Sequence, residues 1–221
     1  TAASLLRQGG ARAIADRPTR FFFAGKVPDG EAIAAGNYSE AKLLAHPYSE
    51  GARQMAWRHL RTPPGFKVVK STPHYATEFT QAQVCLAALG QGWGIRAIWA
   101  MAAGCVPLLP ASPTAYFFGN GGVNYSRFAL PNVPASELDA ALPRRLDNAR
   151  DAGLLDALQQ SLLVHRRLFL WPPAGLAYHM TLRELCRRSS GRPQGAAAAH
   201  GWARPACDRL LPEAEHFSAL L

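Results

Sequence analysis

The stretch that decides the fold is QVCLAALGQGWGIRAIWAMAAGCVPLL, residues 83–109. Its first part, residues 83–89, is a continuous apolar run, which is typical of a strand buried on both faces of a parallel sheet. A glycine-rich turn follows, then a helix expected over residues 95–103 and a second apolar run at 105–109. Two strands joined through a helix in this way predict a parallel pair.

The glycines of this turn predict a site for an anion. In an open parallel sheet, ligands bind beyond the carboxyl ends of the strands, where the next helix offers unpaired N–H groups and a positive dipole end. Gly92 and Gly94 would let a phosphate approach the backbone, and Arg96 would add a planar fork of donors. The spacing G-x-G-x-G is neither the dinucleotide fingerprint nor a Walker loop, so an ordinary turn with a solvated arginine is the alternative.

The remaining elements follow from the same patterns. Strands are expected at residues 20–25 (RFFFAG), 66–70 (FKVVK) and 126–130 (SRFAL), and helices at 49–59, within 135–162, and at 177–187. Alternating strands and helices predict an α/β fold, a Rossmann-like parallel sheet with helices on both faces. From Ser189 the chain is rich in alanine, glycine and proline, and we expect a flexible C-terminal tail there.

Composition sets wider bounds. The 221 residues carry a formal net charge of +9, which favours anionic partners in general. No segment reaches the ~18 consecutive apolar residues of a membrane helix. The four cysteines form no CxxC pair, and neither they nor the scattered histidines have metal-ligand spacing, so no metal site is expected. The cysteines are too few for a disulfide scaffold, and we expect Cys85 and Cys105 to be small core residues.

Several segments, in order, resemble the exostosin-like glycosyltransferases of the plant and algal type. The segments, each similar to a motif of that family, are FFAG at 22–25, YSEGARQ at 48–54, VCLAALG at 84–90, GIRAIWA with GCVPL at 94–108, and YSRFAL at 125–130. The resemblance covers residues 20–188. No single motif decides it, but their order is fairly specific.

The resemblance implies one half of a glycosyltransferase-B fold, the nucleotide-sugar-binding half, over residues 20–188. Residues 1–19 would then lead in from a missing acceptor-binding half, and residues 189–221 would form the disordered tail. The family transfers a sugar from a nucleotide diphosphate donor to a polysaccharide or glycoprotein glycan. It works on the lumenal side of the Golgi membrane, held by an N-terminal anchor that this sequence lacks. The nucleotide sugar is a substrate, and no cofactor is implied.

The expected donor site joins the motif residues. Gly92, Gly94 and Arg96 would bind the diphosphate, and Gly25, Lys26, Arg53 and Trp99 are further candidates for donor binding. Exposed, solvated side chains are the alternative for Lys26 and Arg53. No general base is visible in the sequence, although an inverting transfer would need one, so the catalytic residue is unknown.

Trp99 departs from the family pattern, which has a glutamate there, and Gly94 stands where the family has a serine. An indole N–H can donate but cannot accept, so Trp99 would stack on the ligand or fill the site. This supports an alternative function, an inactive member that binds a nucleotide, a glycan or a partner protein. A nucleic-acid partner is not expected, because the basic residues are dispersed and no RNA-binding aromatic motif is present.

Overall fold

A five-stranded, all-parallel sheet forms the centre of the computed structural model, which describes residues 12–90, 94–112, 116–118, 123–170, 175–190 and 207. The strands lie in the order β2-β1-β3-β4-β5. The predicted α/β fold with a Rossmann-like parallel sheet is therefore confirmed, including the parallel pairing of the two strands around the glycine-rich turn. The strands are β1 (Thr19–Ala24), β2 (Phe66–Val69), β3 (Ala82–Leu86), β4 (Val106–Pro110) and β5 (Leu130–Val133).

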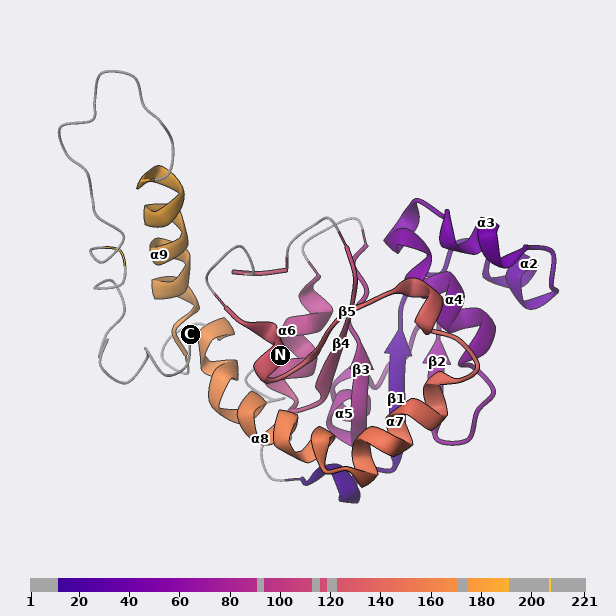
Figure 1. The fold of residues 1–221 in the computed structure, drawn as a ribbon, viewed down its shortest axis with the longest axis horizontal. Coiled ribbons are helices and arrows are strands. Elements are labelled where there is room, and N and C mark those ends of the chain that lie inside the picture. Colours follow the sequence, from indigo (N-terminus) through magenta and orange to yellow (C-terminus); the bar gives the residue numbers. More distant parts are fainter. Residues whose placement is uncertain are drawn as a thin grey trace. The chain divides into compact units, whose positions relative to one another are not determined.

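Helices cover both faces of this sheet. Phe21 and Phe23 of β1 pack in a core with residues of α4 and α7, whereas Phe22, one residue out of phase, packs edge-on against Phe79 of α5. In Figure 1, α7 passes in front of the sheet, and α5 and α6 lie behind it. The helices are α2 (Gly30–Ala34), α3 (Glu40–Leu44), α4 (Ala52–His59), α5 (Tyr75–Gln81), α6 (Ile95–Ala102), α7 (Leu142–Asp151), α8 (Leu154–His165) and α9 (Ala177–Ser190).

The strand order locates a reversal in the sheet. From β1 the chain moves to β2 on one side, and it then returns past β1 to build β3, β4 and β5 on the other. This is the 2-1-3-4-5 order of doubly wound folds, whose ligands bind at the carboxyl ends of the strands where the order reverses. That position lies between β1 and β3.

Some predicted elements differ from the structure. The strand expected at 126–130 is wrong, because Tyr125–Arg127 form a 3-10 turn and β5 begins at Leu130. Phe128 is fully buried within that turn, so its apolar character reflects burial and not an extended backbone. The short helices α2, α3 and α5 have five to seven residues each, too few to show a helical period in the sequence.

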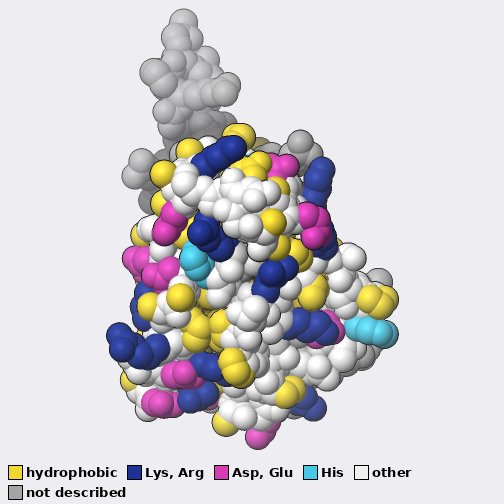
Figure 2. Space-filling view, turned by 90° about the vertical axis from the view of Figure 1, so that its right-hand side faces the viewer, with side chains coloured by type: hydrophobic (Ala, Val, Ile, Leu, Met, Phe, Trp, Pro, Cys, Tyr) yellow, Lys and Arg dark blue, Asp and Glu magenta, His cyan; other side chains and the backbone are white. Residues whose placement is uncertain are grey.

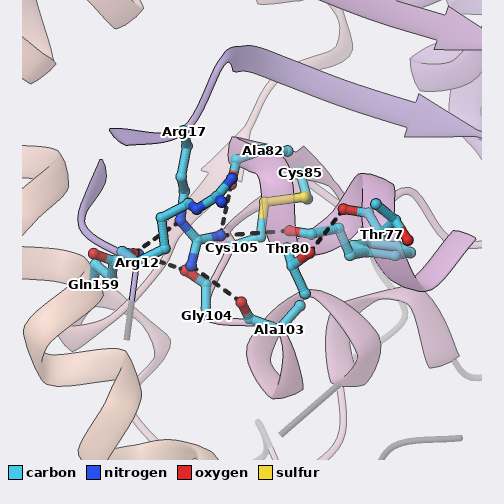
Figure 3. The surroundings of a disulfide bond; sticks show 11 residues. Arg12, Arg17, Thr77, Thr80, Ala82, Cys85, Ala103, Gly104, Cys105 and Gln159 are labelled. Atoms are coloured by element: carbon cyan, nitrogen blue, oxygen red, sulfur yellow. Dashed lines mark hydrogen bonds between the residues drawn. A yellow bond between two sulfur atoms is a disulfide. The ribbon is translucent and has the colours of Figure 1, made fainter. Parts of the chain in front are cut away.

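Arg17 is the most buried cation at the amino ends of the strands, with 2% of its surface exposed. Its guanidinium donates to the carbonyls of Phe79 (3.4 Å), Ala82 (2.8 Å) and Ala103 (3.1 Å) (Figure 3). Phe79 and Ala103 lie at the carboxyl ends of α5 and α6, where the helix dipole is negative. Burial, with a smaller contribution from Arg12, lowers the pKa of Arg17 to about 10, so the residue stays charged at neutral pH.

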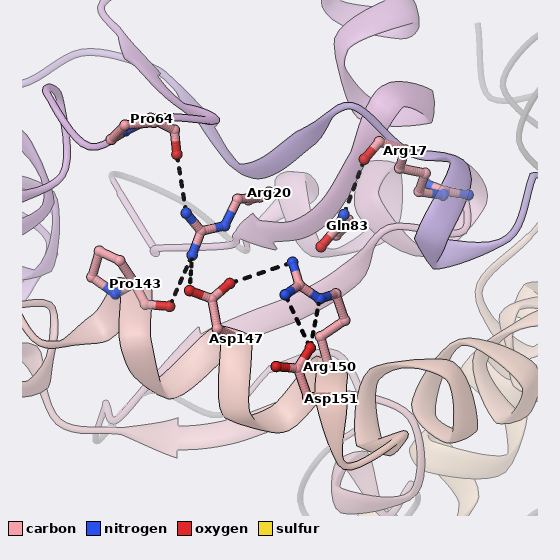
Figure 4. A network of polar contacts seen from close by, with 8 residues as sticks. All are labelled: Arg17, Arg20, Pro64, Gln83, Pro143, Asp147, Arg150 and Asp151. Carbon is pink, nitrogen blue, oxygen red and sulfur yellow. Dashed lines mark hydrogen bonds and ion pairs between the residues drawn. The ribbon is translucent and has the colours of Figure 1, made fainter.

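A second polar network closes the same end of the sheet. Arg20, at the start of β1, donates to the carbonyl of Pro143 at 3.1 Å and pairs with Asp147 of α7 at 2.5 Å (Figure 4). Asp147 also pairs with Arg150 at 3.4 Å. These contacts tie α7 to the amino end of β1.

A disulfide joins Cys85 of β3 to Cys105, directly before β4 (Figure 3). Both residues are fully buried, as expected of core cysteines, and they are also paired, which the sequence did not predict. Neighbouring parallel strands bring residues that are 20 apart in sequence to a Cα–Cα distance of 5.9 Å. This is within the range that a disulfide requires, and only the strand register reveals it.

Two compact units make up the chain. The first holds the sheet, and its core includes Ile14 and Arg17, so the packed domain starts before residue 20. The second comprises residues 115–124 and 165–221. Within it, the backbone N–H of Leu176 donates to Arg167 (2.7 Å) at the start of α9, and Cys186 forms a disulfide with Cys207.

The expected tail at 189–221 lies almost wholly outside the described residues. In the part of the chain that is described, no helix combines the length and the apolar character needed to cross a bilayer.

The first prediction concerns the Cys85–Cys105 disulfide. Replacing both cysteines with serine should lower the free energy of unfolding by about 3 kcal/mol, the chain-entropy value for a loop of this size. Urea unfolding in neutral buffer without reductant measures the difference in free energy of unfolding from wild type. The Cys186→Ser/Cys207→Ser variant is the matched control, because it removes a loop of 21 residues from the other unit. Equal stability of wild type and the Cys85→Ser/Cys105→Ser variant would contradict the prediction.

Candidate functional site

Two arginines meet at the carboxyl ends of β1 and β3. Arg53 comes from α4 and Arg96 from α6, and both guanidinium groups lie near the ring of Phe23, at 5.7 and 5.8 Å from its centroid. Figure 1 shows β1 pointing toward this end of the sheet. We call Gly25, Arg53, Gly90 and Arg96 the switch-point site, because the strand order reverses between β1 and β3.

Arg53 bridges the two loops that leave these strands. Its terminal nitrogens donate to the carbonyl of Lys26, after β1, at 3.1 Å, and to the carbonyl of Ala88, after β3, at 3.2 Å. A third bond reaches the hydroxyl of Tyr48 at 3.0 Å. Arg53 is only 1% exposed, and its Nε is buried without a hydrogen-bond partner. A donor left unsatisfied in this way costs about 1–3 kcal/mol.

Arg96 is half-buried and less constrained. Its Nε donates to the carbonyl of Ala24, the last residue of β1, at 3.1 Å. Among the described residues, its two terminal nitrogens have no acceptor. Arg96 therefore presents the planar donor fork that suits a phosphate or a carboxylate.

The two positive charges lack a protein counterion. In the described part of the chain, no carboxylate pairs with Arg53 or Arg96. Burial, followed by repulsion from Arg96, lowers the pKa of Arg53 to about 10. A bound anion would offset both the repulsion between these two partly buried positive charges and the cost of removing them from water.

Two lysines on another side of the molecule have partners close by. Figure 2 shows basic and acidic side chains interspersed on the side of α2, α3 and β2. On that side Lys70 pairs with Glu31 and lies over the ring of Trp57, and Lys42 lies 4.2 Å from the ring centroid of Tyr38. The arginine pair is more buried than these lysines. Unlike Lys70, neither arginine pairs with a carboxylate of the described residues.

Two glycines allow the arginines to approach the strand ends. A Cβ on Gly25 would lie 2.6 Å from a terminal nitrogen of Arg96, and one on Gly90 would lie 2.6 Å from a terminal nitrogen of Arg53. Gly94 precedes α6 with a φ of 71°, a left-handed conformation that favours glycine. Three of the sequence's glycines at this end therefore have a structural reason. Gly92 lies outside the described residues.

A strained segment leads into α4 and carries Tyr48. Ser49, Glu50 and Gly51 have successive positive φ angles of 57°, 51° and 76°. A Cβ on Gly51 would lie 2.4 Å from the carbonyl oxygen of Leu43, so only glycine fits there. Strain of this kind costs about 1–3 kcal/mol per residue and gathers at functional sites.

Contacts on both sides hold this segment. The Ser112 hydroxyl, just beyond β4, donates to the carboxylate of Glu50 at 2.9 Å. The backbone N–H of Tyr48 donates to His46 Nδ1 at 3.1 Å. The sequence pattern predicts a helix from residue 49, whereas α4 begins at Ala52, and Ser49 and Glu50 instead form the turn that places Tyr48 beside Arg53. The positive φ angles could not be seen in the sequence, and Gly51 alone hints at them.

The other two candidates, Lys26 and Trp99, make no side-chain contact with the arginine pair among the described contacts. Lys26 is exposed, although its carbonyl accepts from Arg53. Trp99 is half-buried and packs edge-on against Tyr75 (5.7 Å between centroids) and Phe79 (6.4 Å). The hydroxyl of Tyr75 donates to the carbonyl of Ala24, the same oxygen that accepts from Arg96. The aromatic group of Trp99 thus adjoins the site through Tyr75.

Comparisons with protein-family models, curated proteins and solved structures found no match to this chain. The function is therefore argued from the site itself and from the order of motifs in the sequence. Within the described residues, no three His, Cys, Asp or Glu side chains converge where they could hold a metal ion.

The second prediction tests the close approach at Gly25. The Gly25→Ala variant should keep its fold, because the nearest clashing atoms belong to the end of the Arg96 side chain, which can move. Its affinity for inorganic pyrophosphate should fall by about 1.5–3 kcal/mol, the value of a hydrogen bond to a charged group. Calorimetry measures the binding, and the melting temperature monitors the fold. Gly90→Ala should also unfold at a lower temperature, since Arg53 is buried and held by three bonds. Unchanged pyrophosphate affinity in Gly25→Ala would count against the site.

Proposed function

We propose that this chain is the donor-binding domain of a glycosyltransferase of the exostosin type. It binds a nucleotide diphosphate sugar at the switch-point site and transfers the sugar to a polysaccharide or glycoprotein glycan. The observation that carries the proposal is the pair formed by Arg53 and Arg96 at the carboxyl ends of β1 and β3. No carboxylate of the described residues pairs with either cation. The order of exostosin-like motifs supports the choice of a nucleotide sugar among the possible anions.

The arginines suit the chemistry of this transfer. When the bond between the anomeric carbon and the diphosphate breaks, negative charge develops on the departing diphosphate. Arg96 offers two unpaired terminal nitrogens to that charge, and the amino end of α6 lies one residue before it. Helix amino ends and arginine forks are the usual partners of phosphate groups. Arg53 would contribute its positive charge, and it would keep the loops after β1 and β3 in place through its bonds to their carbonyls.

The cysteines support the proposed location. We place the protein on the lumenal side of the Golgi membrane, as the family resemblance implies. All four cysteines of the chain are paired, two within each unit. Buried disulfides are characteristic of proteins that fold in an oxidising compartment.

A second candidate function is binding without transfer, to a nucleotide, a glycan or a partner protein. Trp99 favours it, since the family has a carboxylate at this position and the indole packs against Tyr75 and Phe79 instead. An indole cannot accept a hydrogen bond from a ribose or sugar hydroxyl.

The third prediction tests donor binding. Arg96→Ala should weaken binding of a nucleoside diphosphate by about 1.5–3 kcal/mol, roughly 10- to 150-fold in Kd. The free nucleoside should be affected much less, because it brings no phosphate to the fork. Arg58→Ala is the matched control, since Arg58 is an exposed arginine of α4 that donates to the carbonyl of Tyr38. Equal nucleoside diphosphate affinity in wild type and Arg96→Ala, with the fold intact, would refute the proposed site.

The fourth prediction separates the two candidate functions. If the protein is a transferase, wild type supplied with a panel of nucleotide sugars and glycan acceptors should release nucleoside diphosphate. If it only binds, wild type should bind a nucleotide sugar and release nothing. Trp99→Glu reports on the tryptophan itself. Tighter nucleotide binding in this variant would show that Trp99 fills the site, and weaker binding would show that it stacks on the ligand.

A further inference from the structure

The short loop between α2 and α3 contains a tripeptide that matches a modification pattern. Asn37, Tyr38 and Ser39 form an N-x-S sequence in which the middle residue is not proline. This is the acceptor pattern for N-linked oligosaccharides in proteins that enter the secretory lumen. We propose that Asn37 carries an N-linked glycan. The proposal concerns a modification and does not depend on the proposed sugar transfer.

The loop leaves room for such a group. Asn37 is exposed, and among the described residues its side-chain amide has no hydrogen-bond partner. Its backbone N–H donates to the carbonyl of Ala32 at 3.0 Å, which fixes the residue at the end of α2. Gly36, just before it, has a φ of 80°, and a Cβ added there would meet nothing within 4 Å. A bulky, solvated glycan on Asn37 therefore displaces no packed side chain.

The glycan would also leave the arginine pair intact. Asn37 makes no described hydrogen bond with Arg53 or Arg96, whose bonds reach Lys26, Tyr48 and Ala88 from Arg53 and Ala24 from Arg96. Figure 1 shows α2 and α3 beside the β2 end of the sheet, whereas β3 and α6 lie toward its centre. Modification and ligand binding are thus compatible.

The disulfides supply an independent reason for the modification. N-linked glycans are added in the compartment in which disulfides form, and all four cysteines of this chain are paired. One pair, Cys85 of β3 with Cys105, is fully buried, so it forms as the domain folds. A chain that acquires these bonds in the secretory lumen exposes Asn37 to the glycan-adding enzyme.

The modification is a transfer of an oligosaccharide to the side-chain nitrogen of Asn37. Nδ2 of Asn37 forms a bond to the anomeric carbon of a lipid-diphosphate-linked oligosaccharide. The bond between that carbon and the diphosphate oxygen breaks, and its electron pair leaves with the lipid diphosphate. The amide proton that is displaced passes to a carboxylate of the cell's oligosaccharide-transferring enzyme.

A second acceptor pattern, Asn124-Tyr125-Ser126, must be separated from the first. Asn124 and Ser126 are exposed, but the middle residue, Tyr125, is buried, with 8% of its surface exposed and its ring centroid 5.3 Å from that of Phe128. Tyr38, by comparison, is only half-buried in the open loop. Asn37 is therefore the residue to which we assign the glycan.

The experiment expresses the full 221-residue chain behind a secretion signal in eukaryotic cells. Wild type should lose one mobility step on treatment with an amidase that cleaves N-linked glycans, and mass spectrometry should find the converted Asp at position 37. Asn37→Gln should lack that step before treatment. Ser39→Thr preserves the acceptor pattern and should keep the step. Asn148→Gln, an exposed asparagine of α7 outside any acceptor pattern, is the matched control and should behave as wild type.

Three results would overturn the proposal. One is a secreted wild-type protein with no amidase-sensitive step. Another is a step that persists in Asn37→Gln and disappears in Asn124→Gln, which would assign the glycan to the second pattern. The third is an unmodified Asn37 peptide in the mass spectrum of folded, disulfide-bonded protein.

Discussion

The buried charge of Arg17 is the constraint on which the sheet domain depends. Its guanidinium lies at the amino ends of the strands and donates to backbone carbonyls of α5, β3 and the end of α6. These carbonyls would otherwise be unsatisfied at helix ends, where negative partial charge accumulates. A single side chain thus joins three elements from different parts of the sequence, and Gln83 and Gln159 add bonds beside it.

The opposite end of the sheet uses the same residue type with a different outcome. Arg53 also bridges backbone carbonyls, but its Nε stays unsatisfied and a second guanidinium lies beside it. Burial lowers the pKa of both arginines to about 10, but the unsatisfied buried N–H and the neighbouring like charge are found at Arg53. This difference is why we propose an anionic ligand for Arg53 and Arg96 and a purely structural role for Arg17.

Rigid connections surround the arginine pair. The Cys85–Cys105 disulfide closes the segment that contains the glycine-rich turn and α6, so Arg96 is carried on a covalent loop. The strained residues before α4 are fixed by Ser112 on one side and His46 on the other. Both devices reduce the number of positions that the guanidinium groups can take, which favours binding because less entropy is lost when a ligand arrives.

The sequence by itself determined the fold class, the parallel strands on either side of the glycine-rich turn, and the extents of α4 and α6 to within a few residues. These features follow from local patterns, because apolar runs, glycines and prolines act over a few neighbouring residues. It also named Arg53 and Arg96 as candidates, through the resemblance and through the position of the turn. It did not reveal the short helices α2, α3 and α5, the 3-10 turn around Ser126, or the left-handed backbone at Glu50.

What only the tertiary structure decided is which distant residues meet: Cys85 with Cys105, Arg17 with the ends of two helices, and the two arginines over Phe23. Those meetings depend on strand order and register, which arise when the whole sheet assembles and which no local pattern encodes.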